Sequence, residues 1–476
     1  MTGKQRALDS IEQQHLNLES LSDAIWDHPE VGYHESFAAD ALCSFLEENG
    51  FQVERGLAGI PTAFCGSYGS GAPVIGLLGE FDALPGMSQK AGCFEKSAVS
   101  DDQPGHGCGH NLLGVGSLAA ALGLKTYLEA GHPGTVKFFG CPAEEGGSGK
   151  GFMARAGVFQ GLDAAFSWHP GDLNSVSTES TMANYQISYR FQGIASHAAL
   201  SPELGRSALD ALELMNVGVQ FLREHVPVDT RIHYAITDTG GTAPGTVQSH
   251  AEVLYLLRAA QLLQVKALYE RVNKIAQGAA MMTETTVEAK FIKACSNMVL
   301  NTELMKVMQR NLEEIPCDFF DEADMDFARK MAATFTYKDS YFEDVAAQIE
   351  DPVQREEILK DKDAPIHTVI IPLLRETQGF VSSDVGDVSW NCPVAQIGTS
   401  TMPAGTPMHS WQAVAAGKSP MAHKGMIYAA KVIAASAIDV LEDPEIIRRA
   451  KEEFVRRTGG RPYASPIPAD VKPRIP

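Results

Sequence analysis

A cysteine and a histidine stand two residues apart in a glycine-rich stretch, residues 105–111 (GHGCGHN). The thiolate of Cys108 and the imidazole of His110 together favour a borderline-soft transition metal, and the glycines beside them let the backbone fold closely around an ion. A glycine-rich loop with one buried cysteine and no metal would have the same sequence pattern. The spacing therefore indicates a pair of metal ligands and leaves that structural alternative open.

Two adjacent carboxylates, Glu144 and Glu145, come directly after the apolar run 135–140 (TVKFFG). Neighbouring anions repel each other, which is tolerable when a cation neutralises one of them and the other is tuned as a proton carrier. An isolated pair of glutamates is usually a solvated loop, but the position after a buried strand counts against that interpretation. The pair therefore predicts a ligand carboxylate beside a general acid or base.

Two further histidines and an aspartate also follow apolar runs or turns. His169 closes an apolar run, His409 follows a proline-flanked turn, and Asp82 follows the run 73–81 (PVIGLLGEF). A lone histidine in either place is more often a hydrogen-bonded structural residue. Functional residues of a parallel sheet gather at the carboxyl ends of its strands, however, and a strand-end aspartate is suited to orient an imidazole. The convergence predicts one metal site at that edge of the sheet.

Other catalytic signatures are weak or missing. Residues 114–119 (GVGSLA) fit a dinucleotide-binding fingerprint, but the nearest preceding strand ends near residue 81. Close packing of a helix on the sheet explains these small residues better. The sequence contains no P-loop, no G-x-S-x-G and no H-E-x-x-H motif, which excludes the commonest NTPase, serine hydrolase and zincin functions.

The elements that must position these residues follow from the hydrophobic pattern. Up to about residue 180, short continuous apolar runs alternate with helical stretches such as 36–49 and 112–129. Strands buried on both faces have such runs, so this half is predicted to be α/β, with a mainly parallel sheet flanked by helices. The runs 368–374 and 394–400 return to the same style and predict that the last part of the chain completes this domain.

A second domain is predicted between these two parts. Residues 182–294 read as strand, helix, strand, strand, helix and strand, the split βαββαβ unit of a ferredoxin-like fold. We expect an inserted lid or dimerisation domain at 182–294 and a discontinuous catalytic domain at 1–181 and 295–476. Residues 300–366 are polar and acidic and predict a solvated insertion. An acidic cluster could also bind calcium, but this segment lacks the glycine-centred loop of an EF-hand. The proline-rich tail beyond residue 459 is expected to be extended and weakly structured.

The composition is that of an ordinary globular protein of two or three domains. The 476 residues carry 39 Lys and Arg against 59 Asp and Glu, so the formal net charge of −20 repels phosphate backbones and anionic lipid surfaces. No apolar run is as long as a membrane span, and the polar amino-terminal stretch lacks the apolar core of a secretion signal. The eight cysteines are scattered, which favours reduced thiols. We expect no nucleic-acid or membrane partner and a cytoplasmic location.

Seven motifs follow one another along the chain: HPEVGYHE at 28–35, EFDALP at 80–85, GCGHN at 107–111, PAEEG at 142–146, WHP at 168–170, GIASHA at 193–198 and MHS at 408–410. In this order they resemble the M20 metallopeptidase and amidohydrolase family. The nearest likeness is to its amidohydrolase branch, and within that branch to the aminobenzoyl-glutamate hydrolase-like group. The resemblance covers nearly the whole chain apart from the acidic insertion and the proline-rich tail.

In that family an α/β catalytic domain holds two divalent metal ions and an inserted lid domain dimerises, which agrees with the two domains predicted above. The resemblance implies Mn²⁺ or Zn²⁺ as the metal and a homodimer formed through the lid. It also implies that Glu144 is the general acid or base, that Asp82 lies behind the metal site, and that His197 stabilises the oxyanion in a neighbouring subunit's active site. The residues that match metal ligands are Cys108, His110, Glu145, His169 and His409.

The resemblance further implies an amidohydrolase in which a metal-activated water cleaves the amide between an acyl or aroyl group and an amino acid. The expected small-molecule substrate is an aminobenzoyl-glutamate-like compound or a dipeptide. Arg258 of the lid is a candidate to pair with a substrate carboxylate, and His233 is another lid candidate; a structural role is the alternative for both. The chain lacks a lid asparagine of many relatives at 240–246 (GGTAPGT), which weakens the transfer of an exact substrate. Two alternatives are a hydrolytic deaminase of an aromatic amine and a non-catalytic dimeric binding protein on the same fold.

Overall fold

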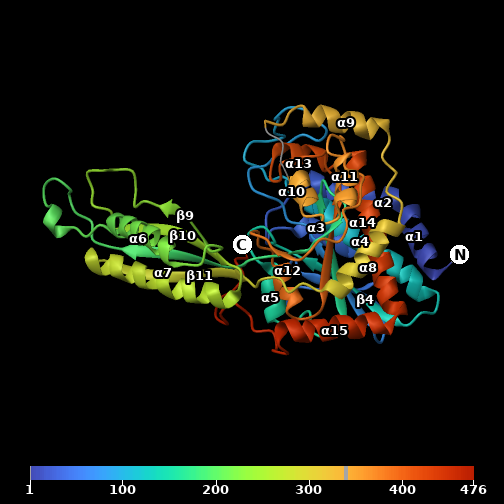
Figure 1. Cartoon of the computed structure of the whole chain (residues 1–476). Coiled ribbons are helices and arrows are strands. Elements are labelled where there is room, and N and C mark those ends of the chain that lie inside the picture. The colour runs from blue at the N-terminus through green and yellow to red at the C-terminus, as the bar shows by residue number, and fades with distance from the viewer. Residues whose placement is uncertain (1, 337–340, 476) are drawn as a thin grey trace.

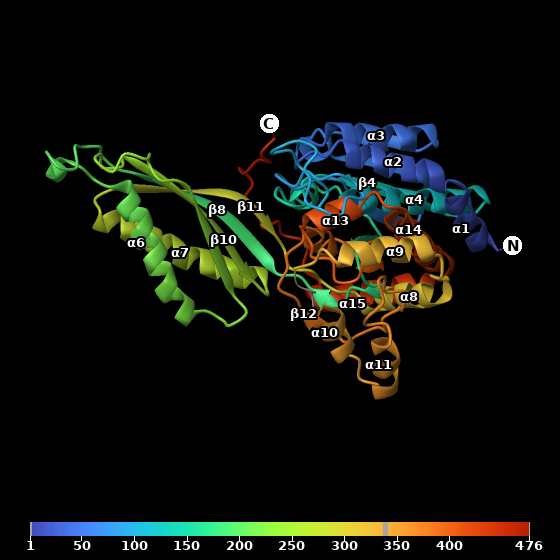
Figure 2. The ribbon, with the colours of Figure 1, turned by 90° about the horizontal axis from the view of Figure 1, so that it is seen from above.

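The computed structural model describes residues 2–336 and 341–475 and shows a body built around a seven-stranded sheet, with an arm projecting from it (Figures 1 and 2). The strand order is β1-β2-β4-β3-β5-β13-β6, and the central strands β4, β3, β5 and β13 run parallel. The predicted α/β fold with a mainly parallel sheet is confirmed. The strands are β1 Gln52–Arg55, β2 Phe64–Ser70, β3 Val74–Glu80, β4 Gly134–Cys141, β5 Ala164–Gly171, β6 Ser175–Val176 and β13 Val394–Ser400.

Helices α4 (His110–Glu129) and α14 (Pro420–Glu442) pack against each other and against this sheet. Both helices are buried along most of their length, which is why their sequences are apolar on nearly every side. A β-carbon at Gly114 would lie 2.7 Å from the backbone oxygen of Glu80, so the small residues of α4 serve helix–sheet packing as predicted. Further helices of the body are α1 Gly3–Gln13, α2 His15–Asp27, α3 Ser36–Glu48, α5 Gly149–Arg155, α12 Val385–Ser389, α13 Trp411–Ala416 and α15 Pro444–Thr458.

The arm consists of a four-stranded antiparallel sheet and two helices (Figure 1). Along the chain its elements are β8 Ala183–Gln192, α6 Ala208–Leu222, β9 Arg231–Asp238, β10 His250–Ala259, α7 Leu262–Met282 and β11 Thr286–Cys295. This is the predicted order of the split unit, and the sheet order is β11-β8-β10-β9. Burial alternates along β10, since one face of the sheet is covered by the packed pair of helices.

The acidic segment 300–366 is not the simple solvated insertion that its composition predicts. Helix α8 (Thr302–Glu314) packs on β13 and α14, and its apolar face is buried. Asp324 is buried as well. Its carboxylate accepts a hydrogen bond from Lys424 and closes the capping box of α9 (Glu322–Ala332), so its oxygens are satisfied. Two short helices follow, α10 Tyr341–Ala347 and α11 Pro352–Leu359, and residues 337–340 of the segment lie outside the described residues.

Two further predictions need correction. The run 368–374 is no strand of the main sheet: it contributes an isolated bridge at Ile370, and Pro372 cannot donate to a ladder. The tail beyond residue 459 is extended but well anchored, because Ile467 is buried and Arg155 donates hydrogen bonds to the carbonyls of Pro468 and Val471. A small parallel pair joins β7 Glu179–Ser180 to β12 Thr377–Gln378.

None of the helices in the described part of the chain has the length and apolar character needed to cross a membrane. All eight cysteines carry free thiols, as their scattered spacing predicts.

Candidate metal centre

The residues predicted to bind metal come from loops at the carboxyl ends of the four parallel strands. Asp82 follows β3, Glu144 and Glu145 follow β4, His169 lies near the end of β5, and His409 lies in the loop after β13. Because neighbouring parallel strands end at the same edge of the sheet, their terminal loops meet there.

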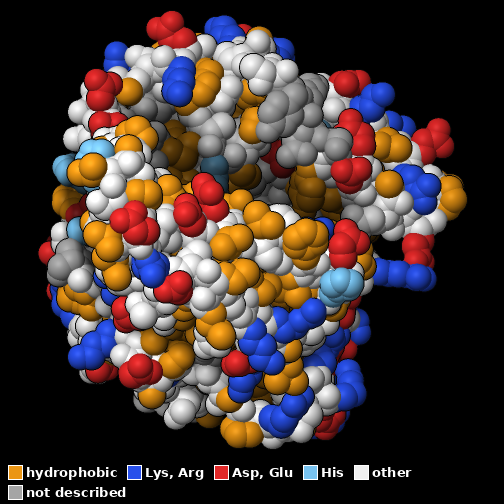
Figure 3. Space-filling model, turned by 90° about the vertical axis from the view of Figure 1, so that its left-hand side faces the viewer, with side chains coloured by type: hydrophobic (Ala, Val, Ile, Leu, Met, Phe, Trp, Pro, Cys, Tyr) orange, Lys and Arg blue, Asp and Glu red, His pale blue; other side chains and the backbone are white. Residues whose placement is uncertain are grey.

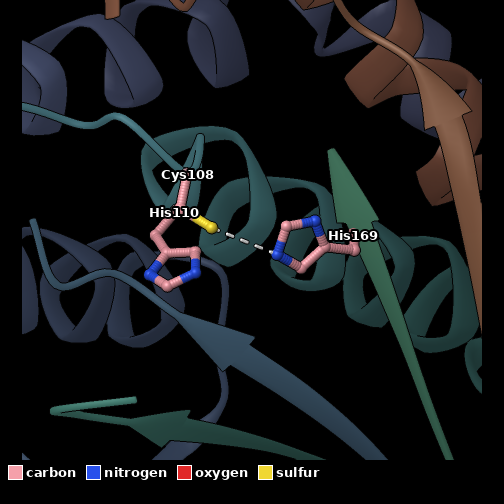
Figure 4. Close-up of side chains that lie close together, drawn as sticks. All are labelled: Cys108, His110 and His169. Carbon is pink, nitrogen blue, oxygen red and sulfur yellow. Dashed lines mark hydrogen bonds between the residues drawn. The ribbon is translucent and has the colours of Figure 1, made fainter. Parts of the chain in front are cut away.

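Cys108, His110 and His169 form one group whose ligand atoms all lie within 4.8 Å of one another. Figure 4 shows their side chains turned toward one another, with Sγ of Cys108 3.4 Å from Nε2 of His169. Both Cys108 and His110 are buried. A thiol and two imidazoles at this spacing form a donor set that suits zinc and similar divalent ions.

A second group shares Cys108 and adds Glu145 and His409, again with ligand atoms within 4.8 Å. Nε2 of His409 lies 3.6 Å from Oε1 of Glu145. The backbone N–H of His409 donates to the carbonyl of Gly107, so the loop after β13 is tied to the loop that carries Cys108. The structure therefore brings together all five residues that the sequence predicts as ligands, in two overlapping groups.

Hydrogen bonds fix which ring nitrogen of two histidines is free. Nδ1 of His169 donates to the carbonyl of Pro170 at 2.8 Å, and Nδ1 of His110 donates to Asp82, whose Oδ1 lies 3.0 Å away. In its neutral form, each ring presents the lone pair of Nε2 to the group. Burial opposes ionisation of His110, but Cys108 and Asp82 raise its pKa well above the ordinary value, so a metal at His110 would replace a proton. Burial, and then the nearby His110, lower the pKa of His169, which favours the neutral form that a metal needs.

Asp82 also organises the neighbouring loop. Its Oδ2 accepts a hydrogen bond from the backbone N–H of Glu145 at 3.0 Å, while Oδ1 holds His110. One buried carboxylate thus sets the position of two predicted ligands, as expected for a group that lies behind a metal site.

Two buried ligand atoms have no hydrogen-bond partner in the described part of the chain: Nε2 of His110 and Oε1 of Glu145. The first lies 3.3 Å from Oε2 of Glu80, but without the geometry of a hydrogen bond. Leaving such an atom unsatisfied costs roughly 1–3 kcal/mol. Divalent cations would satisfy both atoms and balance the carboxylates around them, so the residues present fit a pair of such ions.

Glu144 lies beside these groups, with a carboxylate oxygen within 4.8 Å of the ligand atoms of Glu80 and His110. Burial and the negative charges of Glu80 and Asp384 raise the pKa of Glu144 to about 8. A carboxyl that titrates near neutral pH can both accept and donate a proton. The sequence predicts a general acid or base beside a ligand carboxylate, and this behaviour would suit Glu144 to that role.

A buried charge cluster next to the site was missed by sequence reasoning. Nζ of Lys150 lies 2.6 Å from Oε1 of Glu80 and 2.7 Å from Oδ1 of Asp384, and all three side chains are buried. Burial opposes ionisation of Glu80, but Lys150 and His110 hold the pKa of this carboxyl below its ordinary value. Lys150 lies four residues after the PAEEG motif, and this proximity was the available signal; Asp384 offered none.

The motif at residues 28–35 clamps the loop that carries the glutamate pair. Oε1 of Glu35 accepts a hydrogen bond from the backbone N–H of Ala143 at 2.7 Å, and the hydroxyl of Tyr33 donates to the carbonyl of Gly147 at 2.8 Å. Ala143 has a positive φ of 58°, which needs such support in a residue with a β-carbon. Burial and the charge of Asp82 raise the pKa of Glu35 to about 8.

His197 is not brought to the metal-binding groups of the same chain. It lies in the loop between β8 and α6, at the end of the arm that points away from the body, and its side chain is exposed (Figure 1). Its Nδ1 accepts hydrogen bonds from the backbone N–H groups of Ala199 and Leu200. The proton of the neutral ring is therefore on Nε2, which is left as a hydrogen-bond donor.

The two other lid candidates also lie away from the groups. Nη1 of Arg258 donates to Oγ of Ser382 at 2.9 Å. His233 lies on β9, opposite Leu256 of β10. Neither residue contributes to the metal-ligating groups found among the described residues.

The chain is similar in sequence to known proteins. Residues 76–336 match the sequence profile described as Peptidase family M20/M25/M40. The chain is 46% identical over 474 residues to one of the p-aminobenzoyl-glutamate hydrolase subunits of Escherichia coli K12, covering 98% of this chain and 97% of that protein. It is 32% identical over 334 residues to Xaa-Arg dipeptidase of Mus musculus, covering 67% of this chain and 73% of that protein.

Among solved structures, the fold is similar to that of a dinuclear metal-binding peptidase of the M20 family from Bacillus subtilis. The TM-score is 0.57 at 17% sequence identity, over 90% of this chain and 99% of that chain.

Proposed function

Because the chain belongs to peptidase family M20/M25/M40 and is a hydrolase of amide bonds, we propose that it cleaves the amide between an acyl or aroyl group and an amino acid. The observation that carries this proposal is the meeting of five side chains of metal-ligand type. Two of them, His110 and Glu145, each contain a buried atom without a hydrogen-bond partner in the described part of the chain. The extended similarity to a p-aminobenzoyl-glutamate hydrolase supports a substrate of that type.

Cys108, His110, Glu145, His169 and His409 would hold two divalent ions, for which Mn²⁺ or Zn²⁺ fit the mixed sulfur, nitrogen and oxygen donors. When bound, such ions lower the pKa of water and polarise a carbonyl group. Asp82 keeps the ring of His110 oriented, and the carbonyl of Pro170 does the same for His169. These contacts hold the ligands in place before an ion arrives.

Glu144 moves the proton in this proposal. Its carboxylate takes a proton from the attacking water and delivers it to the leaving nitrogen of the amide, so that the amino acid departs as a neutral amine. The pKa of about 8 places its two protonation states close in energy near neutral pH. The adjacent Glu145 serves as a metal ligand in this proposal.

His197 would donate the Nε2 proton to the oxyanion that forms on the substrate carbonyl of a neighbouring subunit. The proposed lid at 182–294 then also forms a homodimer, while 1–181 and 295–476 form the catalytic domain. Exposed apolar side chains on α6 support an interface there: Leu214, Val217 and Phe221 stand three and four residues apart. Figure 3 shows hydrophobic side chains spread among charged ones on the side of the molecule where the arm ends.

The test is a panel of N-acylated and N-aroylated amino acids and dipeptides, incubated with protein loaded with Mn²⁺ or Zn²⁺. We expect release of the free amino acid, and we expect Glu144→Gln to keep its metal while the rate falls by about 10²–10⁴-fold. Release of ammonia in place of the amino acid would favour a hydrolytic deaminase. Undiminished turnover by Glu144→Gln would remove this residue from the mechanism.

A further inference from the structure

A cavity of about 460 Å³ lies where the body meets the arm, and it reaches the predicted metal ligand Glu145. The last residues of the chain run up between the arm and the body in both ribbon views (Figures 1 and 2). The walls therefore come from three parts of the chain: body loops 31–33, 83–85 and 145–147 with Phe152, strand β11 of the arm with Ile292 and Lys293, and the tail with Arg474.

Two of the lining side chains are basic, Lys293 and Arg474, and the structure describes every lining residue. Neither cation forms a hydrogen bond or an ion pair with any residue in the ranges 2–336 and 341–475; Arg474 is only near enough to Glu252 to help lower the pKa of that carboxyl. Glu145 is the acidic residue of the wall, and its charge belongs to the metal site. In a chain of net charge −20, two cations that share a cavity without counter-ions favour an anionic occupant.

The position of Lys293 is set by an irregularity of β11. The register of β11 against β8 shifts between Phe291 and Lys293, so Ile292 is an extra residue. Successive side chains of a regular strand point to opposite faces, but Ile292 and Lys293 both line the cavity. A β-bulge re-aims side chains in this way and is common beside active sites.

The position of Arg474 is set by the anchored tail. Arg155 donates hydrogen bonds to the carbonyls of Pro468 and Val471, and Ile475 packs against the main hydrophobic core. The exposed guanidinium of Arg474 is thus carried to the cavity by a backbone segment that is fixed on both sides.

We propose that Lys293 and Arg474 bind the carboxylates of the amino-acid half of the substrate and make the enzyme selective for amides of acidic amino acids. This inference rests on the proposed function. An amide held at the metal ligands would extend its amino-acid half into the cavity, where one cation meets the α-carboxylate and the other meets the side-chain carboxylate. The apolar walls at Val31, Leu84 and Phe152 cover the carbon skeleton between them.

The experiment compares kcat/KM for the p-aminobenzoyl amides of glutamate, glutamine and arginine, because glutamine has the shape of glutamate without its charge. We expect the wild-type protein to prefer glutamate over glutamine by at least about tenfold, as one charge-assisted contact provides, and to use the arginine compound least. Lys293→Ala should lower kcat/KM for the glutamate compound about tenfold. Arg474→Ala should lower it about threefold, since exposed contacts are weaker.

At least one of these variants should bring the glutamate-to-glutamine ratio close to one, and Lys293→Arg should retain it. Lys290→Ala and Lys472→Ala are the matched controls, because both lysines are exposed on the same two elements and neither lines the cavity. An unchanged ratio in both alanine variants would overturn the inference. A wild-type protein that hydrolyses none of the three amides would instead contradict the proposed function.

Discussion

The candidate metal-ligating groups of the body and the loop of His197 on the arm place histidines in opposite ways. In the body, hydrogen bonds to Asp82 and Pro170 hold Nδ1 of His110 and His169, which leaves Nε2 of each ring as the atom that can bind a metal. On the arm, His197 is exposed, held by two backbone N–H groups, and presents a donor outward. The difference agrees with the proposal that one chain supplies every metal ligand, while a second chain supplies the oxyanion donor.

The largest expected effect separates these two kinds of histidine. His169→Ala removes a ligand, so the protein should lose bound metal and with it nearly all activity. His197→Ala leaves every ligand in place, so it should keep the wild-type metal content and still lose activity by about 10²–10³-fold, as expected for one oxyanion donor. Elemental analysis beside a rate assay makes the comparison. Full activity of His197→Ala would contradict the role of His197 as an oxyanion donor.

Mixed dimers sharpen the same comparison. Neither Glu144→Gln nor His197→Ala homodimers should be active, but random mixing gives half hybrids with one intact site each, or about a quarter of the wild-type activity. The matched control mixes Glu144→Gln with His169→Ala, because both changes lie in the body and no hybrid site is intact. Equal results from the two mixtures would contradict a site completed across subunits. The 46% identical relative is named as one subunit of a hydrolase. The assay should therefore include size-exclusion chromatography of the pure chain, to determine whether it forms a dimer by itself.

The ion pairs of the two regions should differ in stability. Lys150→Met removes the cation that Glu80 and Asp384 share and leaves two buried carboxylates near each other, which costs about 3–5 kcal/mol of unfolding free energy. Arg190 of the arm pairs with Glu252 at the surface, so Arg190→Ala should leave the denaturant midpoint within error of the wild type. Urea unfolding of the metal-free proteins measures both. Equal losses would show that burial does not separate the two pairs.

The smallest effect is a difference in pH dependence. The pKa of Glu35 in the body is raised from 4.5 to about 8, so its protonated form stabilises the fold at acid pH and this stabilisation is lost as the pH rises from about 4.5 through 8. The pKa of Glu252 on the arm is lowered, chiefly by hydrogen bonds from Ser188 and Arg190, so its contribution is present above 4.5 and is lost as the pH falls further.

Substitution Glu35→Gln should therefore flatten the fall in unfolding free energy of the metal-free protein between pH 5 and pH 8, while Glu252→Gln should leave that interval unchanged. Thermal or urea unfolding across this range provides the measurement. A wild-type curve that rises between pH 5 and pH 8 and is unaltered by Glu35→Gln would contradict the raised pKa.

Hydrophobic patterns in the sequence predicted the elements whose residue types depend on local burial. The apolar runs identified β3, β4 and β5, because strands buried on both faces must be apolar throughout. The predicted ligands meet because parallel strands end at one edge, a rule that needs no knowledge of contacts. The alternation in residues 182–294 likewise gave the order of the arm's elements.

Contacts between residues far apart in the chain could not be predicted from the sequence. Lys150 and Asp384 are 234 positions apart and become partners only when the second half of the chain folds back on the first. Helix α8 looks solvated by composition, but packing on β13 and α14 buries one face of it. The tail beyond residue 459 lacks regular structure, so no periodicity signals that Ile467 and the carbonyls of Pro468 and Val471 hold it to the body.

The most direct test is anomalous X-ray diffraction at the zinc or manganese edge, on crystals of the full chain grown with that metal. We predict two peaks, each in contact with ligand atoms from the set Cys108, His110, Glu145, His169 and His409. Crystals of catalytically active protein with no peak at these side chains, or with the metal bound elsewhere, would contradict a dinuclear centre at the edge of the parallel sheet.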